Sequence, residues 1–111
     1  MAKSKAISDR VTRNGQTAVL VSPGYGAGFV TWASDSEVSP FEPKIVELVL
    51  AGRKGEITAE WVKAELGLDY LYLGGVRDLT VEWLPVGTAF RIDEYDGSES
   101  IVTLSDLAYT A

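Results

Sequence analysis

Two Xaa-Gly pairs near the ends of the chain constrain its fold most strongly. Asn14-Gly15 precedes the apolar run 17–22, which reads as a buried strand, and Asp96-Gly97 separates the β-prone runs 89–95 and 101–104. Both dipeptides favour two-residue hairpin turns, because their residues tolerate the positive φ angles that such turns require. Each end of the chain is therefore expected to form antiparallel β-structure.

The middle of the chain is expected to be helical. Ser39-Pro40-Phe41-Glu42 has the spacing of a capping box with proline at the first helical position, and Gly52 provides a stop. A second helix is expected from Thr58 to Gly67-Leu68, which has the form of a Schellman C-terminus. Apolar residues at helical spacing predict one core-facing stripe on each helix: Ile45, Leu48 and Val49 on the first, and Trp61, Val62 and Leu66 on the second.

The last third of the chain reads as β-structure. The run 70–73 is β-prone, and residues 79–83 alternate between apolar and polar as a half-buried strand does. Leu84-Pro85-Val86-Gly87 fits a type I turn, after which 89–95 would return antiparallel. The predicted fold class is α+β, with an antiparallel sheet made of an N-terminal hairpin and a C-terminal meander, and two short helices packed on one face.

A chain of 111 residues without internal repeats is expected to be one domain. Residues 1–8 are expected to form a flexible basic tail, and 9–111 a single α+β domain. The net charge is −6, but residues 1–16 carry four basic side chains against one acidic one, which is +3. The remainder, 17–111, is therefore −9. Because the body is so acidic, we expect no direct binding of nucleic acid.

Cysteine and histidine are both absent, and this excludes several classes of chemistry. No disulfide, thiolate nucleophile, cysteine-based zinc site or Ser-His-Asp triad can form. We expect a binding protein rather than an enzyme, with no catalytic residue, metal or cofactor. No apolar run reaches the roughly 18 to 20 residues of a membrane-spanning helix, and the polar start has no signal core. The expected location is therefore the cytoplasm, with no membrane contact.

A glycine-rich segment follows the first buried strand. Gly24, Gly26 and Gly28 alternate with other residues and can expose backbone N–H groups to an anion. The segment is not a dinucleotide fingerprint, since no helix pattern follows it. Tyr25 and Trp32 could present aromatic faces to a nucleobase. The alternative is a wide hairpin loop without a ligand.

A polar constellation in the β region is the second candidate site. Arg91 and Asp93 are two apart on one predicted strand and so share a face, where arginine could bind an anion and the carboxylate a sugar hydroxyl. Arg77 and Asp78 are expected to add to this pocket. Glu94 shares the opposite face with apolar residues, and Arg77 is its expected partner. The acidic run 93–99 lacks EF-hand spacing and reads as a solvated turn.

Two sequence blocks, 21–32 (VSPGYGAGFVTW) and 76–99 (VRDLTVEWLPVGTAFRIDEYDGSE), carry a resemblance. The chain resembles, over roughly residues 17 to 101, a group of small accessory proteins encoded by tailed bacteriophages. This resemblance implies action in the host cytoplasm, where such proteins disarm host defence or redirect host metabolism.

Two functions are consistent with these observations, and an enzyme that turns over a nucleotide is a less favoured third alternative. The first is a counter-defence protein that sequesters a small nucleotide-type signal, a cyclic nucleotide or an ADP-ribose derivative, at a subunit boundary of a homo-oligomer. The backbone of Gly24 to Gly28 and Arg91 would bind phosphate, Tyr25 and Trp32 would stack, and Asp78 or Asp93 would bind hydroxyls. The second is an acidic inhibitor that binds a host defence or metabolic protein directly.

Overall fold

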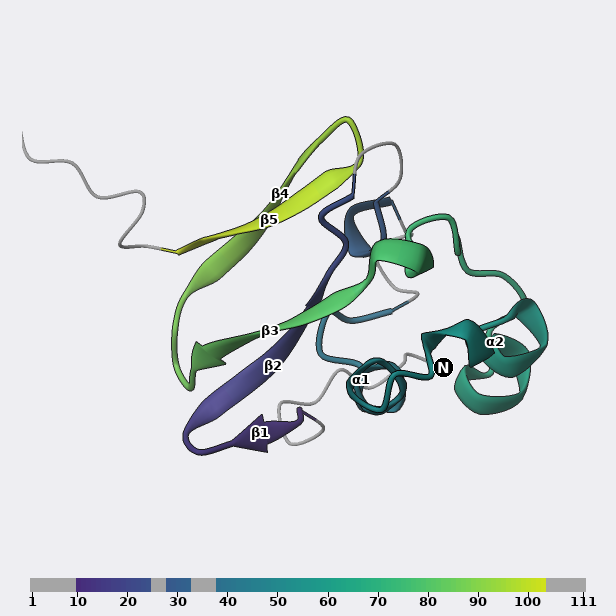
Figure 1. Cartoon of the computed structure of the whole chain (residues 1–111), viewed down its shortest axis with the longest axis horizontal. Helices are drawn as coiled ribbons and strands as arrows, with labels where there is room; N and C mark the ends of the chain where they lie inside the picture. The colour runs from purple at the N-terminus through teal and green to yellow at the C-terminus, as the bar shows by residue number, and fades with distance from the viewer. Residues whose placement is uncertain (1–9, 25–27, 33–37, 104–111) are drawn as a thin grey trace, which may run out of the picture.

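A computed structural model describes residues 10–24, 28–32 and 38–103. Its strands form two antiparallel sheets, one of order β1-β2-β3 and one of order β4-β5 (Figure 1). The strands are β1 (Thr12–Arg13), β2 (Gln16–Val21), β3 (Thr80–Pro85), β4 (Phe90–Tyr95) and β5 (Ser98–Thr103). The helices are α1 (Pro43–Leu50) and α2 (Ala59–Leu66), with 3-10 turns η2 (Val30–Trp32), η3 (Lys54–Glu56) and η4 (Val76–Asp78). The predicted α+β class is confirmed.

Both predicted hairpin turns are confirmed. Asn14 and Gly15 have φ angles of 53° and 78°, and Asp96 and Gly97 have φ angles of 51° and 85°. Two consecutive positive φ angles define the type I′ turn, whose twist matches that of the flanking strands. The register that follows pairs Arg13 with Gln16 in the first hairpin, and Tyr95 with Ser98 in the second.

The C-terminal strands do not form the predicted meander, because β3 pairs with β2 instead of β4. The turn after β3 also lies one residue later than predicted: the Thr88 N–H donates to the Pro85 carbonyl at 3.0 Å. Gly87 is the third residue of this turn, with a φ of 91°, as a type II turn requires and a type I turn does not. The chain leaves the three-stranded sheet there and starts a separate hairpin.

The first helix begins later than predicted. Glu42 is the N-cap, its carboxylate accepting the Lys44 N–H at 3.1 Å, and Pro43 rather than Pro40 occupies the first helical turn. Ser39 instead accepts the Phe41 N–H at 3.0 Å, which makes a turn before the helix. Proline is favoured in the first helical turn because the backbone N–H that it lacks has no helical partner there.

Both helices end at the predicted glycines, and α2 begins at the predicted cap. The Arg53 N–H donates to the Leu48 carbonyl at 2.8 Å across Gly52, which has a φ of 73°, so the full Schellman motif ends α1. Thr58 caps α2 by accepting the Trp61 N–H at 3.2 Å. Left-handed Gly67 ends that helix, and its N–H donates to the Lys63 carbonyl at 3.2 Å, which is the bond of the αL motif rather than the predicted Schellman pair.

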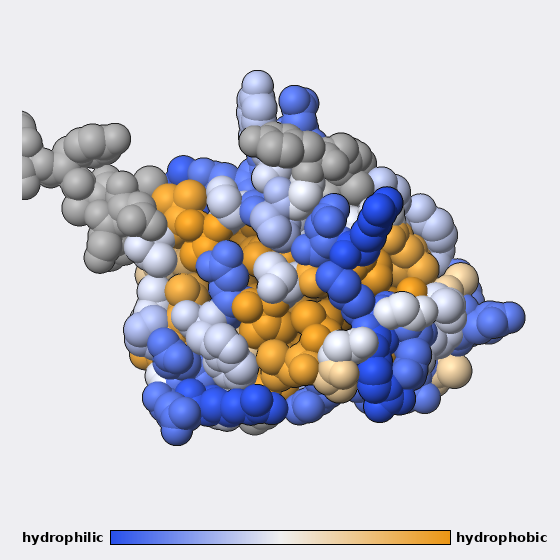
Figure 2. Space-filling model, in the orientation of Figure 1, coloured by the Kyte–Doolittle hydropathy of each residue, from blue (hydrophilic) through white to orange (hydrophobic). Residues whose placement is uncertain are grey.

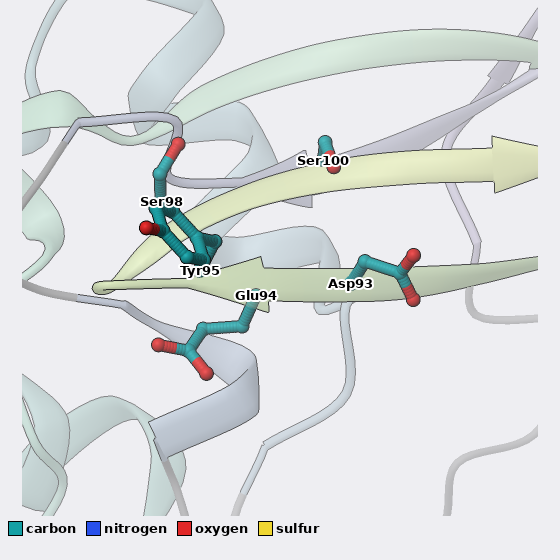
Figure 3. Close-up of a pocket in the computed structure, with 5 residues that line it drawn as sticks. All are labelled: Asp93, Glu94, Tyr95, Ser98 and Ser100. Carbon is teal, nitrogen blue, oxygen red and sulfur yellow. The ribbon is translucent and has the colours of Figure 1, made fainter.

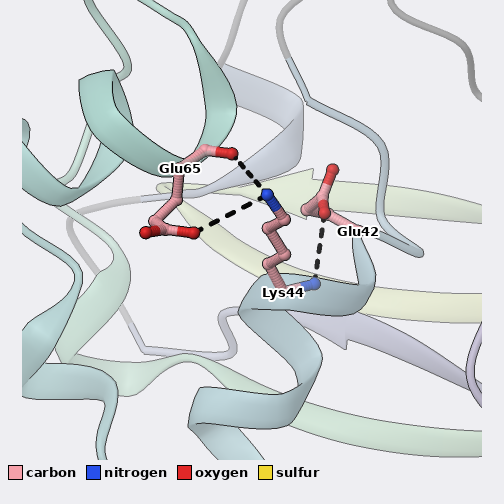
Figure 4. A network of polar contacts seen from close by, with 3 residues as sticks. All are labelled: Glu42, Lys44 and Glu65. Atoms are coloured by element: carbon pink, nitrogen blue, oxygen red, sulfur yellow. Dashed lines mark hydrogen bonds and ion pairs between the residues drawn. The ribbon is translucent and has the colours of Figure 1, made fainter.

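A lysine connects the two helices. The Lys44 Nζ donates to the Glu65 carbonyl at 2.8 Å and lies 3.6 Å from the Glu65 carboxylate (Figure 4). Its backbone N–H is the one that Glu42 caps. The start of α1 is thus tied to the last turn of α2, where a cation also meets the negative end of the helix dipole.

The core lies around β2, whose residues from Thr17 to Val21 are buried on both faces. On one face Ala18 and Leu20 belong to a single apolar cluster with residues of both helices, which confirms that the helices pack on one side of the sheet. Residues 70–73, predicted as β-structure, are irregular. β3 and the β4–β5 hairpin are only partly buried. Figure 2 shows apolar surface at the centre of the face that is turned to the viewer.

Candidate functional site

A buried carboxylate organises the segment that follows β2. Glu99, on β5, is only 1% exposed. Its Oε1 accepts the Ser22 N–H at 2.9 Å, and its Oε2 accepts the Phe29 N–H at 2.7 Å. The Thr31 N–H at 2.9 Å and the Thr31 hydroxyl at 2.6 Å also donate to Oε2. Four donors therefore replace the water that a buried charge loses.

The backbone around this carboxylate is fixed as well. The Glu99 N–H donates to the Ser22 carbonyl at 2.9 Å, so β5 continues the hydrogen bonding beyond the end of β2. The Ser22 hydroxyl donates to the Gly75 carbonyl at 2.8 Å, and the Ser98 hydroxyl to the Pro23 carbonyl at 2.7 Å. Three segments thus meet at one point: the segment before η2, the segment before η4 and the start of β5.

Glu99 changes what the glycine-rich segment can bind. The sequence placed an anion at the backbone N–H groups of Gly24 to Gly28, whereas the N–H groups that face an anion here are those of Phe29 and Thr31, just beyond that segment. The anion, however, is a carboxylate of the same chain. These two N–H groups are consequently unavailable to an external phosphate while Glu99 stays in place.

The predicted site residues of the glycine-rich segment are only partly described. Gly24 lies against Asp78, since a Cβ at this position would overlap the Asp78 carboxylate. Gly28 is buried, and its carbonyl lies where a Cβ of Gly75 would be. Two predicted residues, Tyr25 and Gly26, lie outside the described residues. The backbone of Trp32 is in η2.

The second group of predicted residues divides between two places. Arg91 and Asp93 share the outward face of β4, as predicted, and their Nε and Oδ1 atoms are 2.6 Å apart. This hydrogen bond lowers the pKa of Asp93 and raises that of Arg91. Arg77 is exposed on η4, next to the contact between Gly24 and Asp78. Arg91 is thus paired with an acidic neighbour on its own strand.

The expected pairing of Glu94 with Arg77 is wrong. The Glu94 carboxylate accepts the Gly97 N–H at 2.6 Å, inside its own hairpin. The buried acidic residue on this face is Glu99, which was read as part of a solvated turn. The signal lay in the hairpin register: counting from the Asp96-Gly97 turn pairs Glu94 with Glu99 and places both on the face of Ile92 and Ile101.

A polar pocket of about 400 Å³ lies at the turn end of the β4–β5 hairpin (Figure 3). Its charged lining residues are carboxylates, and its aromatic residue, Tyr95, is 74% exposed. A site with this lining favours cationic or hydrogen-bond-donating groups over phosphate. The lining residues are Asp93, Glu94, Tyr95, Ser98 and Ser100.

A second, largely apolar pocket of about 340 Å³ lies between α2 and the irregular segment 69–74. Nothing in the sequence predicted this pocket, since residues 70–73 were expected to form β-structure. Its lining residues are Ala59, Val62, Asp69, Tyr70, Leu71, Tyr72, Leu73 and Gly74.

Comparison with protein-family models, curated proteins and solved structures finds no match to this chain. Within residues 10–24, 28–32 and 38–103, no three acidic side chains are grouped so that they could hold a metal ion. In the same residues no helix has the length and apolar character needed to cross a membrane. The function must therefore be argued from the surface itself.

Proposed function

We propose that this protein is a non-catalytic inhibitor that binds a basic surface of another protein through the outward face of the β4–β5 hairpin. The resemblance to bacteriophage accessory proteins makes a host defence or metabolic protein the expected partner. The observation that carries this proposal is the anchoring of the hairpin by the buried Glu99 carboxylate.

The anchoring matters because a preorganised surface loses little conformational entropy on binding. Glu99 attaches the turn end of the hairpin to the segment after β2. At the other end, the ring of Phe90 packs edge-to-face on that of Phe41, with their centroids 5.9 Å apart. The hairpin is thus held at both ends, and its outward face is presented in a fixed position.

The outward face has the chemistry of a protein-binding surface. Tyr95 is a large aromatic side chain with 74% exposure, and tyrosine is enriched among residues that dominate binding energies. Serines and carboxylates surround it, and residues 91–96, which exclude the buried Glu99, carry one arginine against three acidic side chains. The charge of −9 on residues 17–111 would steer the protein toward a basic partner.

Sequestration of a small nucleotide has less support. The N–H groups of Phe29 and Thr31 already serve Glu99, and the Arg91 guanidinium serves Asp93. A phosphate would have to displace the Glu99 carboxylate at the first place and would be repelled by the Asp93 carboxylate at the second. Nucleotide binding and homo-oligomer formation therefore stay predictions, which calorimetry with a cyclic dinucleotide and with ADP-ribose can test.

The experiment is affinity capture from a bacterial host lysate, followed by calorimetry with the purified captured protein. We expect Tyr95→Ala to weaken binding at least about tenfold, as for a central interface residue, and Ser100→Arg to weaken it through charge repulsion. Binding should also weaken as salt increases. Tyr70→Ala is the matched control, because Tyr70 is 67% exposed but lies on another surface.

Two results would contradict the proposal. One is a captured protein that binds wild type and Tyr95→Ala equally. The other is the absence of any captured protein together with saturable nucleotide binding that Arg91→Ala abolishes, which would support sequestration instead.

A further inference from the structure

We propose that the apolar pocket between α2 and residues 69–74 binds a small organic cation, an amine or quaternary ammonium with apolar substituents. The pocket is distinct from the hairpin surface and shares no lining residue with the hairpin pocket. Its volume of about 340 Å³ lies within the range of small-molecule sites.

The inner wall of the pocket is apolar and fixed. Val62, on α2, is 1% exposed, and Leu71 is 4% exposed; both belong to the main apolar cluster. These side chains cannot withdraw without disturbing the core. The pocket therefore has a preformed apolar surface for the body of a ligand.

Two tyrosines provide aromatic surface. Tyr70 is 67% exposed, an unusual exposure for a large aromatic side chain that contributes to a pocket. Tyr72 lies against Gly74, because a Cβ at that position would overlap the phenol ring. The absence of a side chain at Gly74 thus leaves room for this ring in the pocket wall. Tyrosine faces carry negative potential and attract cations, most strongly those that are weakly hydrated.

The charge of the lining residues determines whether the pocket prefers a cationic or an anionic ligand. Asp69 is the charged residue among the described residues that line it, and these include neither lysine nor arginine. Asp69 is exposed, so its carboxylate can pair with a cationic group while the substituents of that group contact Leu71 and the rings. An anionic ligand would meet this carboxylate without a compensating cation. The net charge of −6 adds a weaker attraction of the same sign.

The test compares choline with 3,3-dimethyl-1-butanol, its neutral isostere, by NMR titration of the ¹⁵N-labelled full chain. We expect choline to shift the amide signals of residues 59–74 saturably, and the alcohol to bind at least about fivefold more weakly. Tyr70→Ala and Asp69→Asn should each weaken choline binding about fivefold. Tyr70→Phe should retain it, since the aromatic ring is kept, and Tyr95→Ala is the control on the hairpin.

Three outcomes would overturn the proposal. Equal binding of choline and the alcohol would remove the preference for a cation. Equal loss in Tyr70→Phe and Tyr70→Ala would remove the role of the ring. If neither compound shifts residues 59–74 in a wild type that gives a folded spectrum, the site itself is rejected, while the function of the hairpin surface is unaffected.

Discussion

The carboxylate of Glu99 accepts a hydrogen bond from the backbone of Phe29 at 2.7 Å, although 70 residues separate them in the chain. This carboxylate joins the β4–β5 hairpin to the segment after β2. Its donors in the described residues are the Ser22 N–H, the Phe29 N–H, the Thr31 N–H and the Thr31 hydroxyl, and none of them is a basic side chain. A charge satisfied by N–H and O–H dipoles alone depends on all of them being in place. The hairpin and this segment are therefore expected to order together.

Glu99→Gln should be strongly destabilising. The substitution keeps the shape of the side chain but removes the charge, and the NH₂ group of glutamine would face a backbone N–H, donor against donor. We expect a loss of about 2 to 4 kcal/mol in the free energy of unfolding, the range for breaking charge-assisted hydrogen bonds in a buried site. Urea unfolding followed by circular dichroism measures it.

The matched control for that substitution is Glu82→Gln. Glu82 is an exposed glutamate on β3, and the change should stay within about 0.5 kcal/mol. A loss in Glu99→Gln no larger than in Glu82→Gln would show that the buried carboxylate does not anchor the hairpin. The rigid-surface argument for binding would then fail as well.

The Arg91–Asp93 pair predicts a small pH-dependent contribution to stability. The hydrogen bond from Arg91 lowers the pKa of the Asp93 carboxyl in the folded state below its ordinary value of 3.8. The contribution is therefore present above pH 3.8 and is lost as the pH falls through the lower, folded-state pKa. Both side chains are about half exposed, so the effect should be small and screened by salt.

The measurement for this pair is a ¹³C NMR titration of the Asp93 carboxyl group. In wild type its midpoint should lie below the midpoint in Arg91→Gln, and 1 M salt should reduce the difference. Glu56 is an internal control, because its pKa is lowered by Arg53 and should not respond to Arg91→Gln. Identical Asp93 midpoints in the two proteins would show that the pair does not persist in solution.

Local signals in the sequence predicted local structure well. Asn14-Gly15 and Asp96-Gly97 fix their hairpins because each turn depends on the φ angles of two residues alone. Gly52 and Gly67 were likewise placed at the helix ends from local sequence, because a helix end of this kind needs one residue with a positive φ angle. Arg91 and Asp93 were placed on one strand face from their spacing, since side chains alternate along a strand.

The errors in the sequence analysis involve choices between partners. β3 could pair with the following strand or with β2, and it pairs with β2, whose residues from Thr17 to Val21 are buried. Glu94 could pair with a distant arginine, but the Gly97 N–H was three residues away. Glu99 was missed because its donors lie 68 to 77 residues earlier in the chain. Gly24 contacts Asp78, although the sequence analysis assigned these two residues to different candidate sites.

The close approach of Gly75 to Gly28 supplies a last prediction, on how the segment after β2 is held. A Cβ at Gly75 would overlap the carbonyl group of Gly28, which is backbone and cannot rotate away as a side chain can. Gly75→Ala should therefore separate η4 from the segment before η2, and we expect a loss of about 2 to 3 kcal/mol, comparable to other forms of overpacking. Gly55→Ala is the matched control, because a Cβ there meets nothing within 4 Å; it should be neutral or stabilise by up to about 1 kcal/mol.

Thermal unfolding of both variants beside wild type tests the prediction. Equal midpoints for Gly75→Ala and Gly55→Ala would mean that Gly75 and Gly28 are not in contact in solution. If Gly75→Ala is destabilised as expected, hydrogen exchange should also be faster at the Phe29 and Thr31 N–H groups, since these donate to Glu99 from the same segment.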